Sequence, residues 1–206
     1  MKNSHLKLIT PTREIRTVTP RRPKNSEVRT REHLTPGEVE KLIEAVHGNR
    51  HGHRDASMIL MAYRHGLRAA ELCDLRWDQV DFRAAVLHAR RVKNGMPGTH
   101  PIQGDELRAL RRLQRESEAS PFVFVSERGS PFTTAGFARM LERAAAAASL
   151  GIKAHPHMLR HGCGYALANK GHDTRAIQGW LGHRSITSTA VYTALAPNRF
   201  KDFWRE

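Results

Sequence analysis

The chain has 206 residues, which suits a single domain with a core large enough to fold on its own. Lysine and arginine number 34 against 20 aspartates and glutamates, so the net charge is +14, and a polyanionic partner is expected, with nucleic acid a better candidate than an anionic membrane. No apolar run reaches transmembrane length and the first residues lack a signal-peptide core, so we expect a cytoplasmic, nucleoid-associated protein without a membrane partner.

The composition of residues 1–32 differs from that of the rest. This stretch carries nine Lys and Arg against three Glu, together with three prolines. We predict a basic, flexible arm over residues 1–32 and one folded domain over residues 33–206. The arm is either a solvating tail or a segment that contacts the DNA backbone.

The first half of the domain predicts helices. Thr35 as N-cap, Pro36 at the first helical position and Glu38 as partner of a capping box predict a helix start at "LTPGEVEKLIEAV". A second helix is expected around "DASMILMAYRHG" and a short third one at "AAELCDLRW". His51 and His53 precede the second helix in "HGHRD", and we expect both in a solvent-exposed loop.

The second half adds a small sheet and further helices. "AAVLHARRVKNGMPGTHPI" combines a strand-like run, a Gly/Pro-rich turn and a short return, which predicts a β-hairpin. "GDELRALRRLQRESE" is helical, "PFVFVS" is a strand or a buried extended piece, and helical patterns dominate from "TTAGFARML" onwards. The predicted fold is mainly α with a small antiparallel β-sheet, in the α+β class.

Several chemistries find no support in the sequence. There is no Walker motif for ATP, no GxSxG nucleophile elbow and no carboxylate cluster for paired magnesium ions. His157 and His161 have a spacing that metal ligands use, but no further ligand completes the set, and Arg160 between them would repel a cation. We therefore expect neither a metal nor a cofactor.

A different set of residue types suits phosphodiester chemistry. Paired arginines bind a phosphate and stabilise the charge that builds when it is attacked, and a tyrosine can act as the nucleophile. A lysine can protonate the departing oxygen, and histidines can move protons or bond the phosphate. Taken singly, each residue also has an ordinary surface or core interpretation. The candidates are Arg68, Lys93, His157, Arg160, His183 and Tyr192.

The stretch "HPHMLRHGCG" concentrates three histidines and one arginine. Pro156 would begin a helix on which His157 and Arg160, three residues apart, point together towards one phosphate. We expect His161 to pack or hydrogen-bond structurally, and His155, before the proline, to be extended and peripheral.

Two blocks carry a family resemblance. "GLRAAELCDLRWDQVDF" and "HPHMLRHGCGYALANKGHDTRAIQGWLGHRSITSTAVYT" resemble the catalytic domain of tyrosine recombinases, the phage integrase family, over about residues 33–195. The C-terminal block is specific: HxLRH, then LGH, then a tyrosine nine residues after that histidine. The short length is similar to that of the fimbrial phase-variation recombinases. Cys163 departs from the small or hydroxyl residue common at its position, and the N-terminal core-binding domain of most relatives has no counterpart here.

The resemblance implies a site and an activity. The six candidates would be catalytic, with Tyr192 the nucleophile and Glu71 supporting Arg68. Residues 33–206 would be a catalytic domain that cleaves and rejoins DNA through a 3′-phosphotyrosyl link, without metal or ATP. The implied partners are double-stranded DNA at specific recombination sites, three further copies in a homotetramer, and accessory DNA-bending proteins.

Other interpretations stay open at this point. The same chemistry without a partner site would give a type IB topoisomerase-like relaxing enzyme, and a catalytically dead domain would give a DNA-binding regulator. The complete catalytic set argues against the regulator. The C-terminal "APNRFKDFWRE" has an apolar stripe of Phe200, Phe203 and Trp204 that either docks on a neighbouring subunit or packs on its own core.

Overall fold

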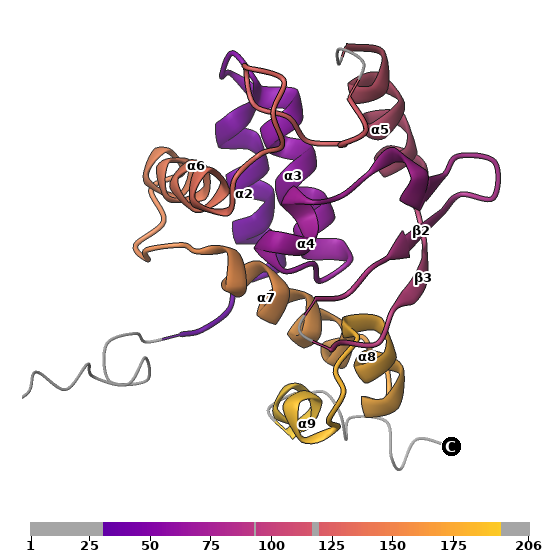
Figure 1. The fold of residues 1–206 in the computed structure, drawn as a ribbon. Helices are drawn as coiled ribbons and strands as arrows, with labels where there is room; N and C mark the ends of the chain where they lie inside the picture. Colours follow the sequence, from indigo (N-terminus) through magenta and orange to yellow (C-terminus); the bar gives the residue numbers. More distant parts are fainter. Residues whose placement is uncertain (1–30, 93, 117–119, 195–206) are drawn as a thin grey trace, which may run out of the picture. The chain divides into compact units, whose positions relative to one another are not determined.

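The computed structural model describes residues 31–92, 94–116 and 120–194. Helices make up most of these ranges, with a small antiparallel sheet beside them (Figure 1). The predicted mainly α fold with a small antiparallel sheet is therefore confirmed. The helices are α2 (Pro36–His47), α3 (Gly52–Arg64), α4 (Ala69–Cys73), α5 (Gly104–Glu116), α6 (Thr134–Ala147), α7 (Pro156–Asn169), α8 (Thr174–Leu181) and α9 (Thr187–Ala194).

Two of the predicted segments lie outside the described residues. They are the basic arm, except for its last two residues, and the apolar stripe near the C-terminus. The division into an arm and a catalytic domain therefore stays a prediction. Within the described ranges, no helix is long and apolar enough to cross a membrane.

Helix α2 begins with the predicted capping box. The Thr35 side chain accepts a hydrogen bond from the backbone N–H of Glu38, and the Glu38 carboxylate accepts one from the backbone N–H of Thr35 at 2.8 Å. Val39, Leu42 and Val46 are buried along one face, and α2 packs against α3 and α7. Helices α2 and α3 together support the elements that carry the candidate site.

A glycine at the end of α3 sets the position of α4. Gly66 has a φ of +56°, a left-handed conformation that glycine adopts without strain. A Cβ atom at this position would lie 2.4 Å from Cδ2 of Leu181, so the glycine also lets the ends of α3 and α8 approach closely. The chain then enters α4 with Arg68 as its N-cap residue.

The sheet has three strands in the order β1-β2-β3. Strands β2 (Val86–Ala89) and β3 (Gly98–Pro101) form the predicted hairpin. Strand β1 (Val80–Asp81) pairs antiparallel with the other edge of β2. The sequence did not predict β1, because two residues are too few for a readable alternation.

The "PFVFVS" stretch, residues 121–126, is the buried extended piece of the two predicted options. Val123 and Phe124 are fully buried, but this stretch joins its neighbours only through isolated bridges. It leads into α6, whose N-cap Thr133 accepts a hydrogen bond from the backbone N–H of Gly136.

The three C-terminal helices share a second, smaller core. Helix α7 packs against both α8 and α9. A Cβ atom at Gly164 of α7 would lie 2.7 Å from the ring of Tyr192, so this glycine lets the tyrosine of α9 lie directly on α7. The buried members of this core are Cys163, Ala168, Ile177, Leu181 and Tyr192.

Candidate active site

A buried carboxylate, Glu71 of α4, organises the first part of the site. Its side chain is 1% exposed and accepts hydrogen bonds from Nη1 and the backbone N–H of Arg68, at 2.7 and 3.0 Å. It also accepts from Nη1 of Arg91 at 2.9 Å and from the backbone N–H of Val92 at 3.1 Å. Burial acts to raise the pKa of Glu71, but these donors hold it below its ordinary value, so the group is ionised. The contact with Arg68 supports the predicted role of Glu71, which stays a prediction.

Arg160 of α7 reaches the ends of two other helices. It is 3% exposed; its Nη2 donates to the carbonyl oxygen of Leu181 at 2.8 Å, and its Nη1 donates to that of Gly66. His157, one turn earlier, is exposed. The two side chains differ in burial, and the expectation that they point together towards one phosphate stays a prediction.

His183 follows the left-handed Gly182 that ends α8. Its Nδ1 lies 2.8 Å from the Thr189 hydroxyl, and its carbonyl oxygen accepts a hydrogen bond from the side chain of Gln178. Burial, with the nearby positive charge of Arg160, lowers the pKa of His183 to about 4. A neutral imidazole held in this way can donate or accept a hydrogen bond in the site.

Tyr192 of α9 is 2% exposed and lies among other aromatic rings. Its hydroxyl is 2.9 Å from Nδ1 of His161, its ring stacks on His183 with centroids 6.3 Å apart, and Tyr165 meets it edge-on at 5.1 Å. Burial raises the pKa of Tyr192 to about 12, against the lowering effect of Arg160. The phenol is therefore protonated at neutral pH.

The remaining two candidates are less closely defined. The ring of His157 lies 5.8 Å from that of His161, which brings it towards the tyrosine side of the site. Lys93 lies outside the described residues. Beyond it, the backbone N–H of Met96 donates to the carbonyl oxygen of Gly182 at 3.2 Å, so this part of the hairpin reaches the residue before His183.

Three arginines surround the single carboxylate of Glu71. Burial, together with the charges of Arg68 and Arg91, lowers the pKa of Arg160 to about 10, and burial also lowers that of Arg91. Arginine side chains stay charged in proteins, so three arginines and one carboxylate carry a surplus of positive charge. Arginines favour a phosphate by bidentate hydrogen bonds, and a surplus in a partly buried site favours an anion.

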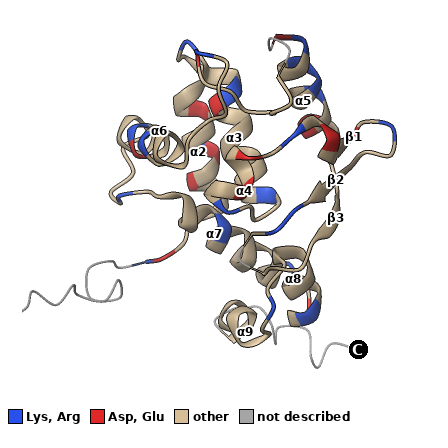
Figure 2. Cartoon of the chain, in the orientation of Figure 1, with Lys and Arg blue, Asp and Glu red and all other residues tan. Residues whose placement is uncertain are grey.

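The positive charge near Tyr192 comes from other parts of the chain. Helix α9 carries no charged residue, and Figure 2 shows Lys and Arg beside α4, on α7 and beside the sheet. The fold therefore brings a neutral, buried phenol near Arg160 of α7 and Arg68 before α4, two cations from separate segments. That arrangement fits a nucleophile that meets a phosphodiester.

Comparison with known proteins agrees with this chemistry. The model of the phage integrase family matches residues 32–199. The chain belongs to the phage integrase family. The tyrosine recombinase resemblance stated from the motifs is thus confirmed.

Two kinds of relative within the phage integrase family illustrate the match. The type 1 fimbriae regulatory proteins FimB and FimE of Escherichia coli (strain K12) are 39% and 41% identical to the chain, over 84% of it and 90% and 91% of their own lengths. Tyrosine recombinase XerA of Pyrococcus furiosus is 35% identical over 82% of this chain and 59% of its own. A crystal structure of XerA recombinase superimposes with a TM-score of 0.72 at 27% identity, over 84% of this chain and 63% of that one.

The sequence analysis did not foresee two contacts of the candidate site. His161 forms a hydrogen bond, as expected, but its partner, the Tyr192 hydroxyl, was not predicted. Arg91 was not singled out at all, although it binds Glu71 from the end of the hairpin strand. One buried arginine among many exposed ones has no recognisable pattern.

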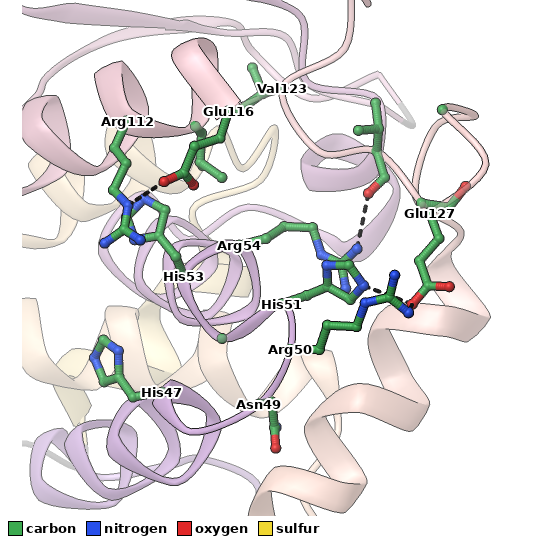
Figure 3. Close-up of a pocket in the computed structure, with 15 residues that line it drawn as sticks. His47, Asn49, Arg50, His51, His53, Arg54, Arg112, Glu116, Val123 and Glu127 are labelled. Carbon is green, nitrogen blue, oxygen red and sulfur yellow. Dashed lines mark hydrogen bonds and ion pairs between the residues drawn. The ribbon is translucent and has the colours of Figure 1, made fainter. Parts of the chain in front are cut away.

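A separate pocket of about 460 Å³ includes none of the predicted site residues. It lies at the N-terminal end of α3, and its charged groups are paired: Glu127 bonds Nε2 of His51 at 2.7 Å, and Arg112 bonds Glu116 at 2.6 Å (Figure 3). Among the described residues, no group of three or more His, Cys, Asp or Glu could hold a metal ion.

The same pocket corrects one prediction. His51 and His53 are half-buried and not in an exposed loop: His51 is the N-cap residue of α3, and His53 lies in its first turn with Nε2 3.1 Å from the carbonyl oxygen of Ala109. Gly52, which suggested a loop, is the first residue of the helix. A Cβ atom there would lie 2.4 Å from the carbonyl oxygen of His47, so the close approach of α2 requires the glycine.

Proposed function

We propose that the chain, a site-specific tyrosine recombinase, breaks and rejoins double-stranded DNA with Tyr192 as its nucleophile. The observation that carries this proposal is the Tyr192 phenol, buried beside the cationic cluster of Arg68, Arg91 and Arg160. A phosphodiester is the substrate whose charge this cluster matches. Solved structures of similar fold include XerH bound to its difH DNA, with a TM-score of 0.71 at 22% identity, over 89% of this chain and 56% of that one.

The reaction follows from the side chains. The Tyr192 oxygen attacks the phosphorus, the bond to the 5′-oxygen breaks, and a 3′-phosphotyrosyl link forms. Arg68 and Arg160 stabilise the negative charge that grows on the non-bridging oxygens, as preorganised donors do. Lys93 gives a proton to the departing 5′-oxygen. Of His157 and His183, one accepts the proton that the Tyr192 phenol loses and the other hydrogen-bonds the phosphate.

The second step reverses the first with a different strand. The 5′-hydroxyl of a partner strand attacks the phosphotyrosyl phosphorus, a new phosphodiester forms, and Tyr192 regains its proton. The energy of the broken bond is kept in the covalent link, so the reaction needs neither ATP nor a metal ion. Exchange between two sites requires several copies, and we propose a homotetramer on two DNA sites, aided by accessory DNA-bending proteins.

The two alternatives make different products. A relaxing enzyme would reseal the original strand and form no four-way junction, and a regulator would bind without cutting. The similarity to recombinases supports neither the relaxing enzyme nor the regulator. An assay of junction formation against simple relaxation separates the first alternative from recombination, and formation of a covalent protein–DNA adduct separates the second.

The decisive experiment uses Tyr192→Phe on nicked DNA that carries a recombination site, for which the DNA flanking the gene is first searched for inverted repeats. A nick next to the cleavage site lets the short cleaved strand diffuse away, which traps the covalent intermediate. The parent should yield a denaturant-stable protein–DNA adduct with a chelator present, and Tyr192→Phe should bind the DNA but yield none. Tyr165→Phe, which alters the neighbouring ring, is the matched control and should keep the adduct.

The outcomes that contradict the proposal are specific. An adduct that persists in Tyr192→Phe places the nucleophile elsewhere. An adduct that requires a divalent metal ion overturns the mechanism. Specific DNA binding by a parent that never forms an adduct supports the regulator.

A further inference from the structure

Arg91, near the end of a hairpin strand, is buried and makes several polar contacts inside the protein. It follows the end of β2 by two residues, and its side chain is 0% exposed. Besides Glu71, its Nη1 donates to the carbonyl oxygen of Gly66 at 3.3 Å, and its Nη2 donates to those of His65 at 3.1 Å and Trp180 at 2.5 Å. One guanidinium thus binds a carboxylate and three backbone carbonyls.

These carbonyls belong to the two segments that carry candidate catalytic residues. His65 is the C-cap residue of α3, Gly66 lies two residues before Arg68, and Trp180 lies in the last turn of α8, three residues before His183. The last carbonyls of a helix lack intrahelical partners and carry partial negative charge, so a cation there is stabilising. Arg91 therefore joins the approach to Arg68 with the approach to His183.

Arg160 binds the same two helix ends. It donates to Gly66 and to Leu181, the neighbour of Trp180. Arg160 is already a candidate for contact with the phosphate, and a guanidinium has a limited number of donors to share. Arg91 binds both helix ends and also Glu71, so it is the guanidinium that connects all three.

We propose that Arg91 is a positioning residue. It fixes the positions of Arg68 and His183 relative to each other, because it binds Glu71 and the carbonyl groups at the ends of α3 and α8. The proposal rests on the proposed function, because it assumes that the relative position of Arg68 and His183 serves phosphodiester cleavage. A planar fork with several donors can serve acceptors in different directions, which a lysine ammonium at the end of a flexible chain cannot reproduce.

The first test needs no DNA. Hydrogen–deuterium exchange is measured on peptides that cover residues 64–75 and 178–184 in the parent, Arg91→Met and Arg91→Lys. We expect faster exchange in both segments and unchanged exchange in α2 and α6. Arg90→Met is the matched control, since Arg90 is the adjacent arginine and its side chain is 67% exposed, 3.6 Å from Asp78.

The second test measures the chemical step. At saturating DNA, both Arg91 variants should form the covalent adduct at least about tenfold more slowly, the scale of losing a precise catalytic geometry. Their DNA affinity and salt slope should match the parent, because Arg91 is buried. Combined with Arg68→Lys, Arg91→Met should slow the adduct by less than the product of the two single effects, since both act through one side chain.

The results separate the two hypotheses. If the parent forms no adduct, the proposed function fails, while the exchange data still report whether Arg91 links the two segments. Unchanged exchange in either segment, unchanged adduct rates, or a fall in affinity that accounts for the lost cleavage each overturn the positioning role. So does failure of both variants to fold, which would make Arg91 a folding residue; if only Arg91→Met fails, Arg91→Lys decides.

Discussion

The hydroxyl of Tyr192 lies 2.9 Å from Nδ1 of His161, on the helix that also carries Arg160. Burial, with the charge of His157, lowers the pKa of His161 to about 4, whereas burial raises that of Tyr192 to about 12. With values this far apart, the phenol keeps its proton and the imidazole is neutral near pH 7, and the two groups share a hydrogen bond. His161 therefore holds the nucleophile in place and does not deprotonate it in this arrangement.

Replacing His161 should slow cleavage. His161→Leu leaves the buried phenol without a partner, and we expect adduct formation to fall by about three- to tenfold, the equivalent of one hydrogen bond. In His161→Asn the side-chain amide can take the place of Nδ1, so most of the rate should be retained. Single-turnover adduct formation measures both, and equal rates for the leucine variant and the parent would remove His161 from the mechanism.

Gly164 provides the space in which the Tyr192 ring lies. The Cβ atom of Gly164→Ala would be 2.7 Å from that ring, so we expect a loss of about 1–3 kcal/mol in the free energy of unfolding, as for other overpacked cores, and slower adduct formation. Gly179→Ala on α8 meets nothing within 4 Å and should be neutral or stabilising by about 0.5–1 kcal/mol. Thermal unfolding of the two variants tests the comparison; equal stability would show that the ring moves aside freely.

Arg160→Lys keeps the positive charge but loses the planar guanidinium that can form two parallel hydrogen bonds to a phosphate. We expect cleavage to fall by at least about a hundredfold, the scale for one preorganised donor, with DNA affinity nearly unchanged because many other cations contact the backbone. Filter binding and adduct formation on the same DNA give the two numbers. If affinity and cleavage fell in proportion, Arg160 would be a docking residue instead of a catalytic one.

Stability should decline in mild acid. His161 and His183 have pKa values of about 4 in the folded protein, below the 6.5 of an unfolded chain, so between these values the unfolded state binds more protons. The free energy of unfolding is therefore highest above pH 6.5 and decreases as the pH falls towards 4. Urea unfolding at several pH values should show a smaller decrease in His183→Gln than in the parent, and an identical profile would contradict the burial of this imidazole.

The basic arm gives a prediction from sequence alone. Deletion of residues 1–32 removes nine Lys and Arg, so DNA binding should weaken. The slope of log affinity against log salt should become shallower by about one unit for each DNA phosphate that the arm neutralises in the parent, because fewer counterions are released on binding. Titration of DNA binding at several salt concentrations measures the slope, and an unchanged slope would mean that the arm only solvates the chain.

Local signals predicted most of the fold. The capping box at Thr35 and the Gly/Pro-rich turn of the hairpin act over a few residues, so their outcome can be read from the sequence. The start of α3 was misplaced because Gly52 serves a contact with α2, which is a tertiary effect. The short strand β1 likewise exists only because β2 is beside it.

The site was predictable by residue type more than by contact. Motifs pointed to Arg68, Arg160 and Tyr192, but the partners of these side chains come from other segments. The bond between Tyr192 and His161 depends on how α9 packs on α7, and the position of Arg91 depends on the ends of α3 and α8. No spacing along the chain encodes either relationship.

The surplus of positive charge around Glu71 links occupancy of the site to folding. Three guanidiniums beside one carboxylate repel one another, and a bound anion relieves that repulsion only in the folded state. By mass action, any such anion shifts the unfolding equilibrium in proportion to the logarithm of its concentration once it exceeds its dissociation constant. The melting temperature of the protein should therefore report phosphate binding, also in Tyr192→Phe, which is expected not to cleave DNA.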